Sequence, residues 1–232
     1  MSTNNVSDIS NFTYEKDRIL NRIYSLVDSN KVKKSILSQI QSVEKDPENV
    51  SFWIALGTKL YEYKKFENAI ECYEYVLMSS PELEYVWYYR GLSLYNIQRY
   101  SEAIESFDNG IKLNPNDGDA WYYKGNSQFY QGSYNDSILS YDKSISISRY
   151  PMGWSNRGKA LDKLGRYEEA IESFDKALQI NKNDSDVWYY KGQSLANLGK
   201  YDLAIESYDE AIHIDHKNSN AWNAKGLALV SQ

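Results

Sequence analysis

The stretch DAWYYKGNSQFY at residues 119–130 has two close counterparts in the chain, EYVWYYRGLSL at residues 84–94 and DVWYYKGQSL at residues 186–195. All six tryptophans follow one register, with spacings of 34, 34, 33, 34 and 34 residues, and each has a glycine four residues later. A fixed period of this length predicts a repeat architecture, in which each unit packs on its neighbours. The pairs are Trp53 and Gly57, Trp87 and Gly91, Trp121 and Gly125, Trp154 and Gly158, Trp188 and Gly192, and Trp222 and Gly226.

Positions zero, four and seven counted from each tryptophan share one face of an α-helix, because the helix turns once in about 3.6 residues. The seventh position holds leucine in five units and Gln128 in the third. The pattern therefore predicts a first helix whose tryptophan side is buried against a second helix of the same unit. We expect all six tryptophans in the core, with the glycines allowing a close approach between helices.

A second set of positions recurs further along each unit, where a small residue is followed four residues later by an aromatic one. Turn-prone words such as LGRY, LGKY and QGSY separate the two sets. Each unit is therefore predicted to be a helix, a tight turn and an antiparallel second helix. The small residues are Ala69, Ala103, Ser137, Ala170 and Ala204, and the aromatic residues are Tyr73, Phe107, Tyr141, Phe174 and Tyr208.

The combined pattern resembles the tetratricopeptide repeat, whose unit of about 34 residues reads W-x2-L-G-x2-Y, then A-x3-F, then P. The resemblance implies an all-α fold in which antiparallel helix pairs stack into a right-handed superhelical solenoid. It also implies a concave groove that binds peptides or proteins. The place of the proline is held in turn by Pro47, Pro81, Pro115, Arg149, Lys182 and His216.

The repeat register divides the chain into eight segments. Residues 1–15 are expected to form a flexible N-terminal tail. Residues 16–49 have apolar residues at helical spacing but no Trp or Gly, so we interpret them as a degenerate capping repeat. Residues 219–232 hold a single C-terminal helix of a partial sixth repeat. The five full repeats are expected at residues 50–83, 84–117, 118–150, 151–184 and 185–218.

A cation stands three residues after five of the six tryptophans, where the tetratricopeptide repeat usually has leucine; Leu56 keeps the usual residue. The second helices offer carboxylates at the same period, so we expect ion pairs between repeats or solvated contacts. A ladder that grips an acidic ligand is the alternative that the sequence leaves open. The cations are Arg90, Lys124, Arg157, Lys191 and Lys225, and the carboxylates are Glu74, Asp108, Asp142, Asp175 and Asp209.

The resemblance implies that the groove is lined from the first helices, on the side away from the second helices. Tyrosine is frequent there, and it offers a rigid apolar ring with one hydrogen-bonding hydroxyl. Any one of these tyrosines can instead stack on a neighbouring repeat, so both interpretations stay open. The predicted lining residues of the second and third repeats are Tyr88, Tyr89, Tyr95, Tyr122, Tyr123, Asn126, Phe129 and Tyr130, and those of the fifth repeat are Tyr189, Tyr190 and Gln193.

The fourth unit departs from this pattern. It has Ser155, Asn156 and Lys159 at the lining positions, and its joint SRYPMGW is one residue short. We expect the groove to change there from aromatic to polar, and the joint to be either a hinge or a neutral deletion. The two-carboxylate clamp, through which some tetratricopeptide repeats bind acidic C-terminal tails, is not expected. The place of its first lysine holds Ile54, Tyr88, Tyr122, Ser155, Tyr189 and Asn223.

Composition excludes several classes of function. The net charge of -6 and the pI of about 5.1 argue against nucleic-acid binding, which needs a basic face. Cys72 is the only cysteine, so no intramolecular disulfide can form. This composition is consistent with a reducing compartment. No secretory signal or membrane-spanning stretch is present in the sequence, so we expect a cytoplasmic protein without membrane contact.

Enzyme motifs are also missing. The sequence has no GxxxxGK[ST], no GxGxxG after a strand and no HExxH. His213 and His216 with Asp209 or Asp215 can meet a metal in principle, but two histidines at a helix end more often lie on the surface. We therefore predict no catalytic residue, no cofactor and no metal site.

The sequence thus favours a non-enzymatic scaffold that binds an extended peptide or a partner helix in a tyrosine-rich concave groove. The alternative is a structural role, either self-assembly into a homo-oligomer through the unfinished C-terminal helix or membership of a longer repeat array. The identity of the protein partner is not encoded in these patterns.

Overall fold

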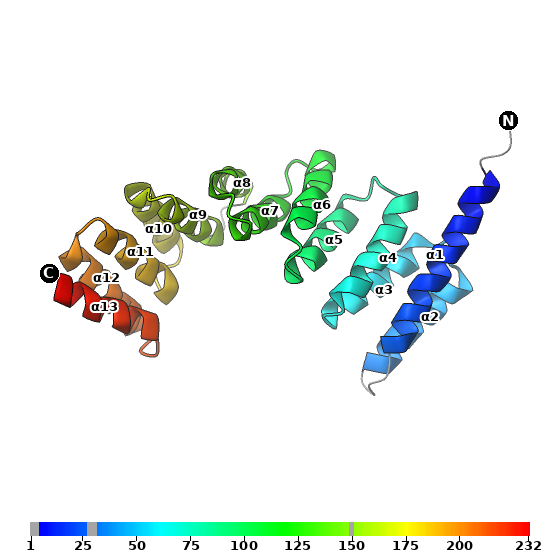
Figure 1. The fold of residues 1–232 in the computed structure, drawn as a ribbon, viewed down its shortest axis with the longest axis horizontal. Coiled ribbons are helices and arrows are strands. Elements are labelled where there is room, and N and C mark those ends of the chain that lie inside the picture. The colour runs from blue at the N-terminus through cyan, green and yellow to red at the C-terminus, as the bar shows by residue number, and fades with distance from the viewer. Residues whose placement is uncertain (1–4, 27–31, 149–150) are drawn as a thin grey trace. The chain divides into compact units, whose positions relative to one another are not determined.

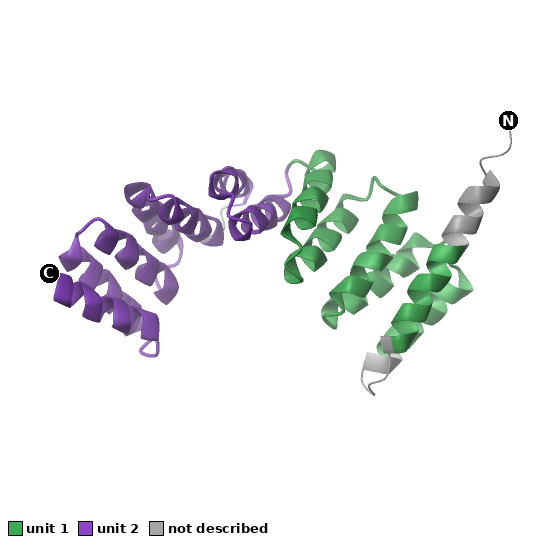
Figure 2. Cartoon of the chain, viewed as in Figure 1, with its two compact units in different colours: residues 1–115 green, residues 116–232 purple. Residues whose placement is uncertain are grey.

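The computed structural model describes residues 5–26, 32–148 and 151–232. The described residues form thirteen α-helices and no strand (Figure 1). They divide into two compact units, Met1–Pro115 and Asn116–Gln232 (Figure 2). The all-α repeat fold predicted from the sequence is confirmed.

The first unit contains three helix pairs. Helix α4 packs between α3 and α5, as expected for stacked pairs, whereas α2 packs on α3 and α1 contacts α4. The N-terminal pair therefore covers both helices of the pair that follows it. The helices are α1 (Asn5–Leu26), α2 (Val32–Lys45), α3 (Val50–Glu62), α4 (Phe66–Ser79), α5 (Glu84–Asn96) and α6 (Tyr100–Leu113).

Helix α1 differs from the expected flexible tail at residues 1–15, because it begins at Asn5. Val6, Ile9 and Phe12 stand three residues apart and extend the apolar spacing of the later part of α1 towards the N-terminus. Residues 5–15 thus belong to α1, which continues without a break across the expected boundary at residue 15.

The second unit contains three helix pairs and a single last helix. Each helix packs on the one before it and the one after it, from α7 through to α13. The short joint before the fourth repeat includes residues 149 and 150, which lie outside the described residues. The helices are α7 (Gly118–Tyr130), α8 (Tyr134–Ile147), α9 (Pro151–Lys163), α10 (Tyr167–Ile180), α11 (Ser185–Asn197), α12 (Tyr201–Ile214) and α13 (Ser219–Ser231).

Polar side chains cap the N-termini of four first helices, α3, α7, α11 and α13. The side chains of Asn49, Asp117, Asp184 and Asn218 each accept a hydrogen bond from a backbone N–H in the first turn of the helix that follows. These caps satisfy backbone donors that have no partner within the helix.

The five tight turns between paired helices that the structure describes close in the same way. Just after the first helix, one residue has a positive φ, and the next residue donates its N–H to a carbonyl in the last turn of that helix, as from Arg99 to Leu94 at 2.9 Å. Glycine fits this left-handed position best, and the last three turns use it. The positive-φ residues are Lys64, Gln98, Gly132, Gly165 and Gly199.

The core of each pair is built on contact between the repeat glycine and the aromatic residue of the second helix. A Cβ built on any of the first five glycines would lie only 2.6 to 2.8 Å from that aromatic ring. Glycine is therefore required at these sites for the close approach of the two helices. The pairs are Gly57 with Tyr73, Gly91 with Phe107, Gly125 with Tyr141, Gly158 with Phe174, and Gly192 with Tyr208.

The tryptophans do not all lie in the core, which corrects the expectation from the sequence. Trp53 is fully buried, because Ile36, Ile40 and Val43 of α2 belong to the same apolar cluster. The next four are only partly buried, and Trp222 is 54% exposed.

Four of the indole rings also hydrogen-bond to the loop before their own helix. The indole N–H groups of Trp53, Trp87, Trp188 and Trp222 donate to the backbone carbonyls of Pro47, Pro81, Lys182 and His216, at 2.9 to 3.1 Å. Each of these tryptophans thus ties its helix to the loop that joins the repeats.

Candidate functional site

In the first unit, the predicted groove residues Tyr88, Tyr89 and Tyr95 are all partly buried on α5. Tyr88 packs on Phe107 of its own repeat, with ring centroids 6.2 Å apart. Tyr89 stacks on Tyr73 of the preceding repeat, also at 6.2 Å. These tyrosines therefore contribute packing within and between repeats while keeping part of their surface exposed.

The second unit repeats this arrangement. Tyr189 packs on Tyr208 of its own pair at 6.1 Å, and Tyr190 stacks on Phe174 of the preceding pair at 6.2 Å. Tyr122 likewise packs on Tyr141, at 6.1 Å. The rings therefore stack on neighbouring residues, as one of the two interpretations has it, while each keeps part of its surface exposed, and their role in lining a binding groove stays a prediction.

A polar network joins α7 to α9 at the predicted polar part of the groove. The amide of Asn156 donates to Asn126 Oδ1 at 2.9 Å and to the Tyr122 hydroxyl at 3.0 Å. The Tyr141 hydroxyl donates to the same Asn126 oxygen at 2.9 Å. Burial raises the pKa of Tyr122, and these amides oppose the shift by hydrogen bonding.

Two predicted lining residues are in fact buried. Asn126 and Ser155 are only 6% and 9% exposed, so a ligand in the groove cannot contact them directly. Asn126 instead accepts hydrogen bonds from the Tyr141 hydroxyl and the Asn156 amide within the network described above. The polar residues Ser155 and Asn156 of the fourth repeat thus contribute partly to packing between helices.

Lys159 is the predicted lining residue with the most unusual surroundings. Its ammonium group lies 4.4 Å from the centroid of the Tyr190 ring. In the part of the chain that the structure describes, no carboxylate lies within ion-pair distance of this partly buried group. Burial lowers the pKa of Lys159, and the negative charges of Asp186 and Asp184 partly oppose this. A cation over an aromatic face without a carboxylate partner is suited to binding an anionic group.

The remaining predicted residues surround this region with different exposures. Phe129 packs on Tyr134 with ring centroids 5.3 Å apart, and Tyr130 is 60% exposed. The amide of Gln193 donates to the Tyr189 hydroxyl at 3.4 Å. A hollow of about 120 Å³ lies between α7 and α9, lined by Asp119, Tyr122, Tyr123 and Met152.

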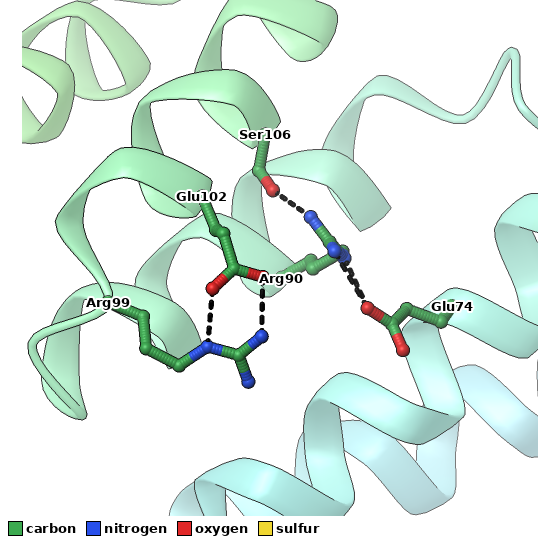
Figure 3. A network of polar contacts seen from close by, with 5 residues as sticks. All are labelled: Glu74, Arg90, Arg99, Glu102 and Ser106. Atoms are coloured by element: carbon green, nitrogen blue, oxygen red, sulfur yellow. Dashed lines mark hydrogen bonds and ion pairs between the residues drawn. The ribbon is translucent and has the colours of Figure 1, made fainter.

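Four cations of the ladder form ion pairs with the preceding repeat, as the sequence predicts. Arg90 pairs with Glu74 at 2.7 Å and also donates to Ser106 (Figure 3). Arg157 pairs with Asp142 at 2.7 Å and donates to Ser173 at the same distance. The remaining pairs within the second unit are Lys191 with Asp175 and Lys225 with Asp209.

The same cations lie over their own tryptophans. Lys124 and Lys191 are 5.0 Å from the ring centroids of Trp121 and Trp188, and Arg157 is 5.8 Å from that of Trp154. Arg157 and Lys191 each contact an aromatic ring and also pair with a carboxylate of the previous repeat. These two cations therefore already have binding partners within the chain. Sequence reasoning found the carboxylates but missed the rings, although the spacing of three residues places both on adjoining faces of the helix.

Larger hollows flank this ladder. One of about 650 Å³ lies against α10, α11 and α12, and another of about 540 Å³ lies between α7 and α8. Both contain the tryptophan and the cation of their repeat, with exposed charged residues at the rim. They recur with the repeat, so they follow from the spacing of the helices.

Comparison with known proteins identifies the repeats. The tetratricopeptide repeat family model matches residues 84–117, 151–184 and 185–218. These three segments of the chain are tetratricopeptide repeats. Proteins of this family are generally non-enzymatic scaffolds for protein–protein interaction.

Solved tetratricopeptide repeat structures have the same fold. The crystal structure of YrrB, described as a TPR protein with an unusual peptide-binding site, has a TM-score of 0.71 at 20% identity over 81% of this chain and 97% of its own. A crystal structure of MamA has a TM-score of 0.70 at 22% identity over 75% of this chain and 95% of its own. MamA from Desulfovibrio magneticus RS-1 has a TM-score of 0.70 at 18% identity over 73% and 97%. No curated protein sequence matches the chain.

Two further observations bear on partners of this protein. None of the helices within the described ranges is both long enough and apolar enough to cross a membrane. The thiol of Cys72 is fully buried, and burial raises its pKa, so it is poorly suited to act as a nucleophile.

Proposed function

We propose that this protein is a non-enzymatic scaffold that binds an extended peptide along the first helices of the second unit. The face comprises the partly buried rings of Tyr122, Tyr123, Tyr189 and Tyr190 with Lys159 among them. Extended peptides are recognised by rigid aromatic surface with a few polar anchors, and this face has both.

The observation that carries the proposal is the state of Lys159. Its ammonium group is partly removed from water, and no described carboxylate compensates it within ion-pair distance. A carboxylate of a bound peptide would supply the missing partner, and the surrounding tyrosines would bury the adjacent apolar side chains. We therefore propose that the preferred peptides contain an acidic residue flanked by apolar ones.

The relatives agree with a peptide-binding role at the level of the fold. YrrB is described as having an unusual peptide-binding site, and the family generally mediates protein–protein interaction. The sequence identity to YrrB is 20%, so the proposal for this chain rests on its own residues.

Selection of peptides from a random library on the full chain tests the proposal. We expect the selected peptides to be enriched in acidic residues and to lose at least about tenfold in affinity for a Lys159→Met variant, measured by fluorescence anisotropy. Affinity should also fall as pH rises through a lysine pKa below the usual range, because only the charged amine attracts a carboxylate.

Lys163→Met is the matched control, because Lys163 is exposed one turn further along the same helix. It should bind the same peptides almost as the unmodified chain does. Selected peptides whose affinity is unchanged by Lys159→Met, or lowered equally by both substitutions, would contradict the proposal.

A further inference from the structure

A small hollow in the second unit combines two tyrosines with an aspartate. It lies between α7 and α9 and is lined by Asp119, Tyr122, Tyr123 and Met152. The two tyrosine rings stand at 78° to each other with their centroids 5.2 Å apart, so they form a corner rather than a flat surface. The volume of about 120 Å³ admits a group of a few non-hydrogen atoms.

Within the described part of the second unit, the Asp119 carboxylate has no cation within ion-pair distance. Asp119 is not needed to cap α7, because Asp117 already accepts hydrogen bonds from the backbone N–H groups of Asp119 and Ala120. Burial and the negative charge of Asp117 raise the pKa of Asp119. The charged form of Asp119 therefore lacks a stabilising partner.

The fifth repeat has the same pair of residues and shows which chemistry the pair favours. Asp186 and Tyr190 hold the register positions of Asp119 and Tyr123. The ammonium group of Lys159 lies 4.4 Å from the centroid of the Tyr190 ring, and the negative charge of Asp186 stabilises the charged form of this lysine. Within this chain, an aspartate with a tyrosine four residues later thus attracts a cation to the aromatic ring.

We propose that the hollow at Asp119 binds an arginine side chain of the peptide that occupies the tyrosine face. A guanidinium group fits this lining better than an ammonium group, because it stacks on an aromatic ring and donates two parallel N–H groups to a carboxylate. Met152 offers apolar surface to the methylene groups of the arginine. The identity of the carrier, a peptide, rests on the proposed function, whereas the recognition of the guanidinium group does not.

The positions of Met152 and Lys159 on α9 set the spacing between the two charged anchors of the peptide. These residues are seven positions apart, which is about 10 Å along the helix axis. An extended peptide covers this distance in about three residues. The arginine should therefore stand about three or four residues from the acidic residue that pairs with Lys159.

Methyl NMR of the full chain, isotope-labelled at its three methionines, reports directly on the hollow. The probe is N-acetyl-arginine N-methylamide. We expect the Met152 methyl signal to shift to saturation during the titration, while the signal of Met78 in the first unit stays unchanged. N-acetyl-citrulline N-methylamide has nearly the same shape without the charge, so it should leave both signals unchanged.

Asp119→Asn and Asp186→Asn form a matched pair, because both remove a carboxylate from the same register position and both residues are exposed. Asp119→Asn should weaken binding of the arginine probe at least about threefold, as expected for loss of an exposed charge pair. Asp186→Asn should leave the affinity for the probe unchanged. An equal shift of Met152 with the citrulline probe, or equal affinity of the two variants for arginine, would overturn the proposal.

Peptides selected on the full chain separate this inference from the proposed function. They should contain arginine about three or four residues from the acidic residue, and should bind Asp119→Asn at least about threefold more weakly. Selected peptides that depend on Lys159 but not on Asp119 would overturn this inference and leave the proposed function standing. A saturable shift of Met152 with the arginine probe, in a chain whose peptides are insensitive to Lys159→Met, would confirm the guanidinium site and contradict the proposed function.

Discussion

Trp53 and Trp222 hold the same register position in surroundings that differ sharply. Trp53 is fully buried beside α2 and has its ring centroid 4.4 Å from that of Tyr75, whereas Trp222 is 54% exposed. Both donate an indole hydrogen bond to the preceding loop. Burial, and not the shared motif, should therefore decide the energetic contribution of each tryptophan.

We expect Trp53→Ala to lower the free energy of unfolding by about 3 to 5 kcal/mol, because it leaves a large cavity in the apolar cluster. Trp222→Ala should cost no more than about 1 to 2 kcal/mol, chiefly through the lost hydrogen bond and partial packing. Urea denaturation of the two variants measures this difference. Equal losses would mean that the loop contact, which both tryptophans share, dominates.

The features that the sequence predicted correctly depend on contacts within one helix pair, whereas those it missed depend on contacts with other elements. The glycine and aromatic positions were found correctly because both recur in every unit and touch within one helix pair. The exposure of the tryptophans was missed because it depends on which element covers the pair. Lys159 was predicted as a groove residue from its place in the repeat, but whether a carboxylate lies within ion-pair distance of it depends on distances that sequence spacing does not give.

At the scale of single elements, the turns between paired helices differ in backbone strain, because only some of them have glycine at the position with a positive φ. Lys64 and Gln98 have φ values of 58° and 63°, where the later turns have glycine. A side chain with a Cβ is disfavoured in this left-handed region by about 1 to 2 kcal/mol. The first two turns are therefore strained relative to the last three.

We expect Gln98→Gly to raise the free energy of unfolding by up to about 1 kcal/mol, because relief of the left-handed strain exceeds the extra entropy that glycine gives the unfolded chain. Gly199→Ala, at the same place in the fifth repeat, should lower it by about 1 kcal/mol. Thermal denaturation compares the two. A loss of stability in Gln98→Gly would show that the side chain makes a compensating contact.

At the scale of the whole molecule, stability in a repeat protein depends mainly on contacts between neighbouring elements. Helix α11 packs on α10, α12 and α13, whereas α13 packs on α12 and α11 from one side only. The ends of such an array should open more easily than its interior.

Hydrogen exchange followed by mass spectrometry should therefore show faster exchange in residues 219–231 than in residues 185–197, by at least about tenfold in protection. Equal protection of the two helices in the free chain would contradict this account of stability.

The indole hydrogen bonds also bear on which substitutions the loops between repeats can tolerate. Their acceptor is always a backbone carbonyl, supplied by Pro47 and Pro81 in the early loops and by Lys182 and His216 in the later ones. Because every residue type has this carbonyl, substitution of the side chain leaves the bond available. The family proline can thus be lost without releasing the loop, and the loops can accumulate substitutions while the helices keep their register.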